Sequence, residues 1–87
     1  MDTGNIPKLA NGYRFQWEPA QNSHVLLYPE GMKVLSESAA AIIELINGED
    51  SVEQIISTLE SKFPDADLRQ DVLDFLTTSA AEGWLNV

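Results

Sequence analysis

The fold of this 87-residue chain is decided by one stretch, His24-Val25-Leu26-Leu27-Tyr28-Pro29-Glu30-Gly31-Met32-Lys33-Val34-Leu35. Residues 24–28 are almost wholly apolar, which predicts the central strand of a small sheet. Proline and glycine occupy the second and fourth positions of the tetrapeptide 28–31, as in a type I turn. Because a turn this short joins antiparallel strands, residues 24–28 and 32–35 are predicted to form a hairpin.

A further strand is predicted before the hairpin, over residues 13–18, where apolar and polar side chains alternate strictly. This period of two places the two kinds of side chain on opposite faces of a half-buried strand. The two sets are Tyr13, Phe15 and Trp17, and Arg14, Gln16 and Glu18. Residues 19–23 are turn formers. Residues 1–11 show little periodicity, so we expect a flexible N-terminal lead-in before a single domain over residues 12–87.

After Leu35 the apolar spacing changes to three and four residues, which predicts helices. Ser36 is the expected N-cap of the first helix, and Asn47-Gly48 supplies a left-handed stop. The second helix begins at Ser51, which has capping-box spacing to Gln54, and it ends at Pro64.

The third helix is predicted to begin at Asp67 as its N-cap and to end at Gly83. Trp84-Leu85 then fold back onto its last turn. Three strands followed by three helices give an α+β domain, a winged-helix-like three-stranded antiparallel sheet followed by a three-helix bundle.

The charge balance excludes several classes of partner. Fourteen acidic and five basic residues give a formal charge of −9, and the basic residues are scattered. Nucleic acids and anionic membranes need clustered lysine and arginine, so neither is expected as a partner. The chain has no cysteine, no apolar run long enough to cross a bilayer and no visible signal peptide. These features predict a cytoplasmic domain.

No catalytic or metal-binding constellation is found. The single histidine, His24, lies inside an apolar strand, where a general base would lack an orienting partner. Asp67, Asp71 and Asp74 share one helical face, but one face alone leaves the coordination shell of a cation open. We therefore expect a protein that is not an enzyme and that carries no metal or cofactor.

One alternative rests on the segment Gly48-Glu49-Asp50-Ser51-Val52. It resembles the segment of acyl carrier proteins in which a serine at a helix start receives phosphopantetheine. Against this hypothesis, carrier domains are all-helical, and Val52 stands where they have leucine. The simpler interpretation is that Ser51 caps a helix.

The edge of the sheet is the most promising candidate site. Met32-Lys33-Val34-Leu35 ends the hairpin with no sequential neighbour on its outer side, and Lys33 is its only charge. Proteins usually guard such edges with charge or cover. An unguarded edge can take up an extended peptide as a fourth strand. The alternatives are that the N-terminal arm or a second copy of the chain covers the edge. Leu73 lies off the core stripe of the third helix, which comprises Leu68, Val72, Phe75 and Leu76, so we expect it beside such a groove.

The residues of this region resemble the PqqD family of pyrroloquinoline quinone (PQQ) biosynthesis. The resemblance lies in residues 25–32 and in Leu35-Ser36-Glu37-Ser38-Ala39-Ala40, with Phe63-Pro64 and Gly83-Trp84-Leu85 further on. It implies a peptide chaperone, the founding type of RiPP recognition element. Such a protein binds the ribosomal precursor peptide PqqA and presents it to the radical SAM enzyme PqqE.

The resemblance also implies a binding site between the third strand and the last helix. On this chain the strand part is the main chain of Met32, Lys33, Val34, Leu35 and Ser36. The facing residues of the last helix, placed by helical spacing, are Arg69, Leu73, Leu76, Thr77 and Ala80. Iron–sulfur clusters and cofactor belong to the enzyme partner. We expect a monomer or a weak homodimer.

Overall fold

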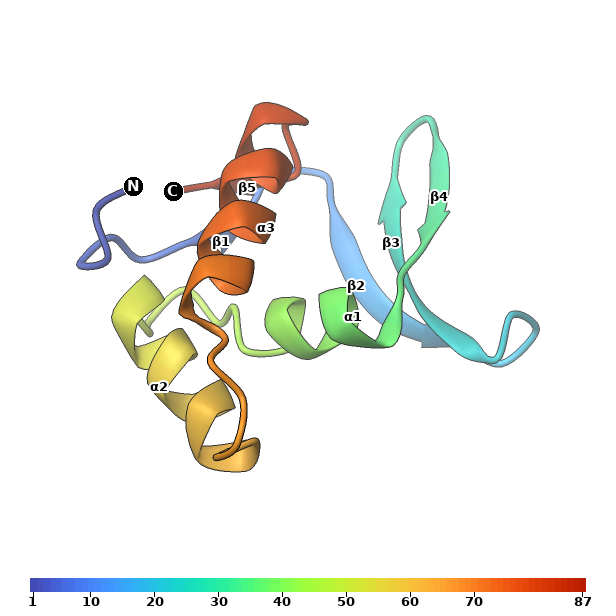
Figure 1. Cartoon of the computed structure of the whole chain (residues 1–87). Coiled ribbons are helices and arrows are strands. Elements are labelled where there is room, and N and C mark those ends of the chain that lie inside the picture. Colours follow the sequence, from blue (N-terminus) through green and yellow to red (C-terminus); the bar gives the residue numbers. More distant parts are fainter.

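The three strands of the main sheet precede the three helices along the chain, as the sequence predicts. The computed structural model describes all 87 residues. Its elements are β1 (Lys8–Leu9), β2 (Arg14–Glu18), β3 (Ser23–Tyr28), β4 (Gly31–Val34), α1 (Glu37–Ile43), α2 (Val52–Lys62), α3 (Arg69–Ala81) and β5 (Leu85–Asn86). Figure 1 shows the β3–β4 hairpin standing to one side of the three helices. The α+β class with a three-stranded antiparallel sheet is confirmed.

The three-stranded sheet has the order β2-β3-β4, so the apolar strand β3 is central, as expected. Leu26 of β3 pairs with Phe15 on one side and with Lys33 on the other. Cross-strand partners point to the same face of a sheet. Leu26 is fully buried in contact with the helices, so this face is the one that the helices cover.

The N-caps of the first two helices follow the sequence prediction. The Ser36 side chain accepts a hydrogen bond from the Ala39 N–H (3.2 Å). Ser51 and Gln54 form the complete capping box. Helix α1 ends before the predicted stop at Asn47-Gly48, because the amides of Leu45 and Ile46 bond to carbonyls three residues back and tighten the chain.

The predicted cap of the third helix was wrong. Helix α3 begins at Arg69 with Leu68 in the cap position, and no side chain caps it. Leu68 packs against the buried residues of the helices. Burial of Leu68 therefore places an apolar residue at the cap, one position after Asp67. The other end of α3 is as predicted: Gly83 has a φ of 88°, and the Trp84 N–H bonds back to the Ser79 carbonyl (2.9 Å).

Two buried clusters form the interior. The first, here called the helical core, comprises Ile42, Val52, Ile55, Ile56, Leu59, Val72, Leu76 and Leu85. The second, the sheet core, comprises Leu26, Leu35, Ala40 and Ile43. Phe75 and Trp84 pack against both clusters, so they join the sheet to the helices.

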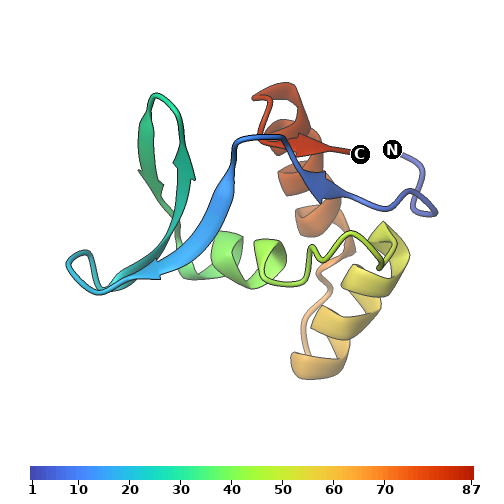
Figure 2. The same ribbon diagram turned by 180° about the vertical axis from the view of Figure 1, so that it is seen from behind.

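A second, two-stranded sheet was missed by the sequence reasoning. Strands β1 and β5 pair in antiparallel fashion and bring the two ends of the chain side by side (Figure 2). Upstream of β1, the Thr3 and Asn5 carbonyls accept hydrogen bonds from the first amides of α2, and Pro7 is buried. The domain boundary at residue 12 stays a prediction. No helix has the length and apolar character that a membrane crossing requires.

Candidate functional site

Strand β4 is an edge strand whose free side can be read from its hydrogen bonds. The Leu35 N–H donates to the His24 carbonyl (3.0 Å), so Leu35 faces β3. Backbone groups of an antiparallel strand alternate between its two sides. With the register Leu26–Lys33 and Leu27–Met32, Lys33 faces β3 as well. The N–H and C=O groups of Met32 and Val34 therefore point outward, away from the sheet.

The side chains of β4 divide between the two faces of the sheet. Met32 and Val34 lie on the face away from the helices and are 41% and 48% exposed. Lys33 lies on the helix-covered face, opposite Leu26. Its ammonium sits 5.1 Å from the centre of the Trp84 ring, a cation–π contact across the space between β4 and the end of α3. The strand thus exposes backbone and apolar groups, and it turns its one charge toward the helices.

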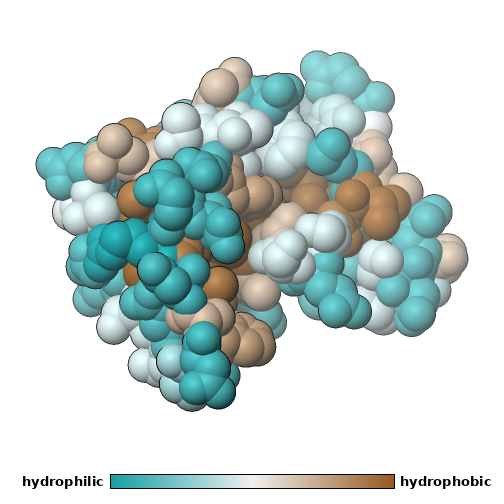
Figure 3. Space-filling view, in the orientation of Figure 1, coloured by the Kyte–Doolittle hydropathy of each residue, from teal (hydrophilic) through white to brown (hydrophobic).

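A hollow opens where β4 ends, with a volume of about 640 Å³. Figure 3 shows apolar surface sunk between the helices, and a second apolar area on the side of the sheet. The lining comes from the start of α1, the end of α2 and the first turns of α3. Its residues are Ser36, Glu37, Ser38, Ala39, Ala41, Ile42, Leu59, Phe63, Ala66, Leu68, Asp71, Val72 and Phe75.

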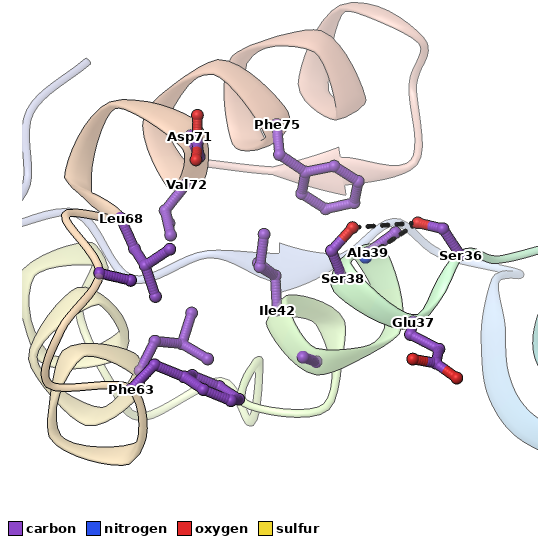
Figure 4. A pocket seen from close by; sticks show the side chains of 13 residues that line it. Ser36, Glu37, Ser38, Ala39, Ile42, Phe63, Leu68, Asp71, Val72 and Phe75 are labelled. Atoms are coloured by element: carbon purple, nitrogen blue, oxygen red, sulfur yellow. Dashed lines mark hydrogen bonds between the residues drawn. The ribbon is translucent and has the colours of Figure 1, made fainter.

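The hollow begins at Ser36, two residues after the last residue of β4. In Figure 4 the Phe75 ring projects from α3 toward Ser36 and Ser38, and Phe63 approaches from the opposite side. Glu37 and Asp71 are the charged lining residues, and both are exposed. The hollow therefore begins close to the end of the free edge, and its lining is chiefly apolar and contains no basic residue.

The structure brings together the strand residues predicted from the sequence. Met32, Lys33 and Val34 are exposed along the edge, and Ser36 opens the hollow. Leu35 follows β4, is buried in the sheet core and donates its N–H to the His24 carbonyl, so neither its side chain nor its N–H is free to meet an added strand.

The five predicted residues of α3 do not line the hollow. Arg69 binds Glu53 of α2, and Leu73 is half-buried against the helical core. Leu76 is completely buried, so it supports the helix from beneath. Thr77 is exposed and Ala80 is half-buried, outside the lining.

The lining uses a different face of α3. Residues along a helix turn by about 100° each, so Leu68, Val72 and Phe75 lie on a face rotated from that of Leu73 and Thr77. The sequence reasoning placed these three residues in the core stripe. The one signal that pointed to the hollow is Phe63, an aromatic residue at a helix end beside Pro64, which is 53% exposed.

One ion pair, between Arg69 and Glu53, joins the starts of α2 and α3. Hydrogen bonds from the Arg69 guanidinium lower the pKa of Glu53 below its ordinary value of 4.5. The same hydrogen bonds raise the pKa of Arg69. This exposed pair is a structural contact between helices, away from the β4 edge.

The other residues singled out in the sequence have structural roles. His24 stacks on Phe15, with ring centres 4.8 Å apart, and meets the Trp17 ring edge-on. Asp74 accepts a hydrogen bond from Gln70 (2.8 Å). Ser51 is engaged in its capping box, and the three-stranded sheet departs from the all-helical fold of a carrier protein.

Comparison with known proteins places this geometry in a family context. The family model described as coenzyme PQQ synthesis protein D (PqqD) matches residues 23–85. A PqqA binding protein of Azotobacter vinelandii is 49% identical over 84 residues, which cover 95% of this chain and 91% of that protein. A PqqA binding protein of Kluyvera intermedia is also 49% identical, over 98% of this chain and 94% of its own length.

A solved structure shares the fold. It is the solution NMR structure of the PqqD truncation of Methylobacterium extorquens PqqCD, described as a functional, stand-alone RiPP recognition element. The two chains are 31% identical with a TM-score of 0.79, over 99% of this chain and 94% of that one.

Proposed function

This chain belongs to the PqqD family, and from that premise we propose that it binds the precursor peptide PqqA by taking it up as a strand beside β4. The relatives named PqqA binding protein support the identity of the peptide. The observation that carries the mode of binding is the outward direction of the Met32 and Val34 backbone groups on an unpaired edge. An extended peptide can satisfy these groups with its own N–H and C=O groups.

The hollow gives the added strand its specificity. A peptide that pairs with Met32 and Val34 runs directly on to Ser36, where the apolar lining begins. Side chains on its inner face then meet Ile42, Phe63 and Phe75. In this proposal the strand residues Met32 to Ser36 are retained from the sequence. The α3 residues predicted from helical spacing are replaced by Leu68, Asp71, Val72 and Phe75.

The energetics fit a transient carrier. Ordering a flexible peptide offsets much of the energy of its contacts, so an interface of this kind gives a dissociation constant of about a micromolar or somewhat tighter. Binding of that strength allows the peptide to pass to a second protein. A chaperone role, with the chemistry performed elsewhere, follows from this exchange.

The second protein in this proposal is PqqE, the radical SAM enzyme that the family resemblance implies. The chain would hold PqqA and present it to that enzyme, acting as a monomer or weak homodimer in the cytoplasm. The winged-helix-like description of the fold belongs to the same set of predictions. Size-exclusion chromatography with light scattering, of the chain alone and mixed with PqqA and PqqE, tests both the oligomeric state and the assembly.

Titration of PqqA into isotope-labelled protein tests the binding mode. We expect the largest amide shifts along Met32, Val34 and Ser36, with smaller shifts at Phe75. Slowed amide hydrogen exchange at Met32 and Val34 is expected on binding, because these amides gain acceptors. Unchanged exchange at both amides in a saturated complex would show that the peptide binds elsewhere.

A further inference from the structure

Lys33 has no acidic partner within this acidic chain. The chain carries a formal charge of −9, yet its single ion pair joins Arg69 and Glu53. The Lys33 ammonium lies instead over the Trp84 ring. A lysine ammonium has three N–H donors, and contact with a ring face leaves donors directed away from the ring. Lys33 can therefore donate a hydrogen bond to a carboxylate without losing its contact with Trp84.

The position of Lys33 relates it directly to an added strand. The N–H and C=O groups of Lys33 point toward β3 and not toward the new strand. Lys33 and the peptide residue opposite it would therefore be a non-hydrogen-bonded pair, the kind of pair in which opposite side chains come closest. The residue of the peptide opposite Lys33 would place its side chain on the helix-covered face. Cross-strand pairs of opposite charge are favourable at this distance.

The same register links Lys33 to the hollow. Side chains on one face of a strand recur at every second residue, with a rise of about 3.3 Å per residue. Ser36, at the mouth of the hollow, is three residues beyond Lys33. In our proposal, the peptide side chain two or four residues from the one opposite Lys33, on the same face, is the one that reaches the hollow beside Ser36. No basic residue lies among that lining.

We propose that Lys33 is a specificity-determining residue that pairs with one acidic side chain of the bound peptide. A bulky apolar side chain two or four residues away on the same face enters the hollow. The charge pair sets the register of the strand, and the apolar side chain supplies the burial. This inference rests on the proposed uptake of a strand at β4 and adds the side-chain chemistry that selects it.

A double-mutant cycle between protein and peptide tests the pairing. Each acidic residue of synthetic PqqA is replaced in turn by its amide, and each peptide is titrated calorimetrically into wild-type protein and into Lys33→Met. Methionine keeps the apolar stem and removes the charge. We expect Lys33→Met to weaken binding of native PqqA by up to about five-fold, as for a cross-strand pair of opposite charge at an exposed position. One of the amide-substituted peptides should bind wild-type protein more weakly by the same factor. The same replacement should leave the affinity for Lys33→Met almost unchanged.

Two further variants serve as controls. Lys33→Arg keeps the charge and should retain most of the affinity, and Lys62→Met removes a lysine from the end of α2, outside the lining, and should leave binding unchanged. Unaltered affinity for Lys33→Met, or amide replacements that cost the same in both proteins, would overturn the inference.

The variant Val34→Pro separates the two levels of the proposal. If Val34→Pro binds PqqA more weakly but no acidic residue of the peptide is coupled to Lys33, the charge pairing is wrong and strand addition stands. If folded Val34→Pro binds PqqA with unchanged affinity, strand addition at β4 is wrong. Circular dichroism of each variant confirms that the fold is intact.

Discussion

The three-stranded sheet has two edges, and they differ in how they are guarded. Strand β2 carries Arg14, Gln16 and Glu18 on the face away from the helices, so charges flank that edge. The corresponding face of β4 carries Met32 and Val34. Charged side chains on an edge discourage pairing with another chain, whereas an uncharged edge invites it. The comparison teaches that one sheet can close one edge and leave the other open.

The two edges also differ in what lies beyond them. Strand β2 ends in a turn in which the Gln21 N–H bonds to the Glu18 carbonyl. Strand β4 leads into Ser36 and the hollow between the helices. Only β4 therefore combines free backbone groups with a cavity that can receive side chains. This combination of features is the reason why we propose β4 as the edge that binds the peptide.

The largest expected effect comes from the residue that supports both edges. Leu26 of β3 is fully buried between Phe15 and Lys33. Leu26→Ala should lower the free energy of unfolding by about 2–5 kcal/mol, because it leaves a cavity in the sheet core. Urea unfolding followed by circular dichroism measures the loss. Leu27→Ala, at a half-buried neighbouring position, is the control and should cost less.

A proline at Lys33 should break the ladder on the inner side of β4. The Lys33 N–H faces β3, so Lys33→Pro removes a sheet hydrogen bond and should cost about 2–3 kcal/mol of stability. Val34→Pro removes an outward N–H and should cost clearly less. Equal unfolding midpoints for the two variants in a thermal melt would contradict the assignment of inward and outward groups.

Prolines placed on the two edges should affect peptide binding differently. Val34→Pro removes an N–H that the added strand would use, so the binding free energy of PqqA should fall by about 1–3 kcal/mol. Trp17→Pro removes an outward N–H on β2 and should leave binding unchanged.

Calorimetric titration of both proline variants measures the difference between the edges. Val34→Ala and Trp17→Ala correct for the lost side chains. If Trp17→Pro weakened binding as much as Val34→Pro, the distinction between the two edges would not hold.

The smallest expected effect concerns the ion pair that lies away from both edges. The pKa of Glu53 is lowered in the folded state by its hydrogen bonds to Arg69. The stability that this contributes is present above about pH 4.5 and is lost as the pH falls through the lowered pKa. Glu53→Gln should therefore reduce the melting temperature slightly near neutral pH, and this reduction should shrink as the pH falls through the lowered pKa. PqqA binding should not change, and a clear loss of affinity would place the start of α3 in the binding site.

Local sequence signals predicted most of the elements. Alternation over residues 13–18 and the apolar run over 24–28 located β2 and β3, and the serines at 36 and 51 located two helix starts. These signals lie within short stretches of the chain, so neighbours in the sequence are sufficient to produce them. The prediction at Asp67 was wrong because burial of Leu68, a tertiary contact, moved the cap.

The candidate site was predicted only in part for a similar reason. The unguarded edge from Met32 to Val34 could be read from composition and turn chemistry alone. The α3 face that lines the hollow depends on the rotation of α3 about its own axis, which packing against α1 and α2 decides. Helical spacing around Leu73 therefore led to a different face from that of Phe75.

By itself, the sequence determined the order of the three main strands and the three helices, the central place of β3 and the single charge of β4, since each depends on residues close together in the chain. Only the tertiary structure decided the pairing of β1 with β5, the position of Lys33 over Trp84, and the hollow beside Ser36. These features join segments that are distant in sequence. Their geometry is set by how the helices pack on one another and on the sheet, a property that no local pattern encodes.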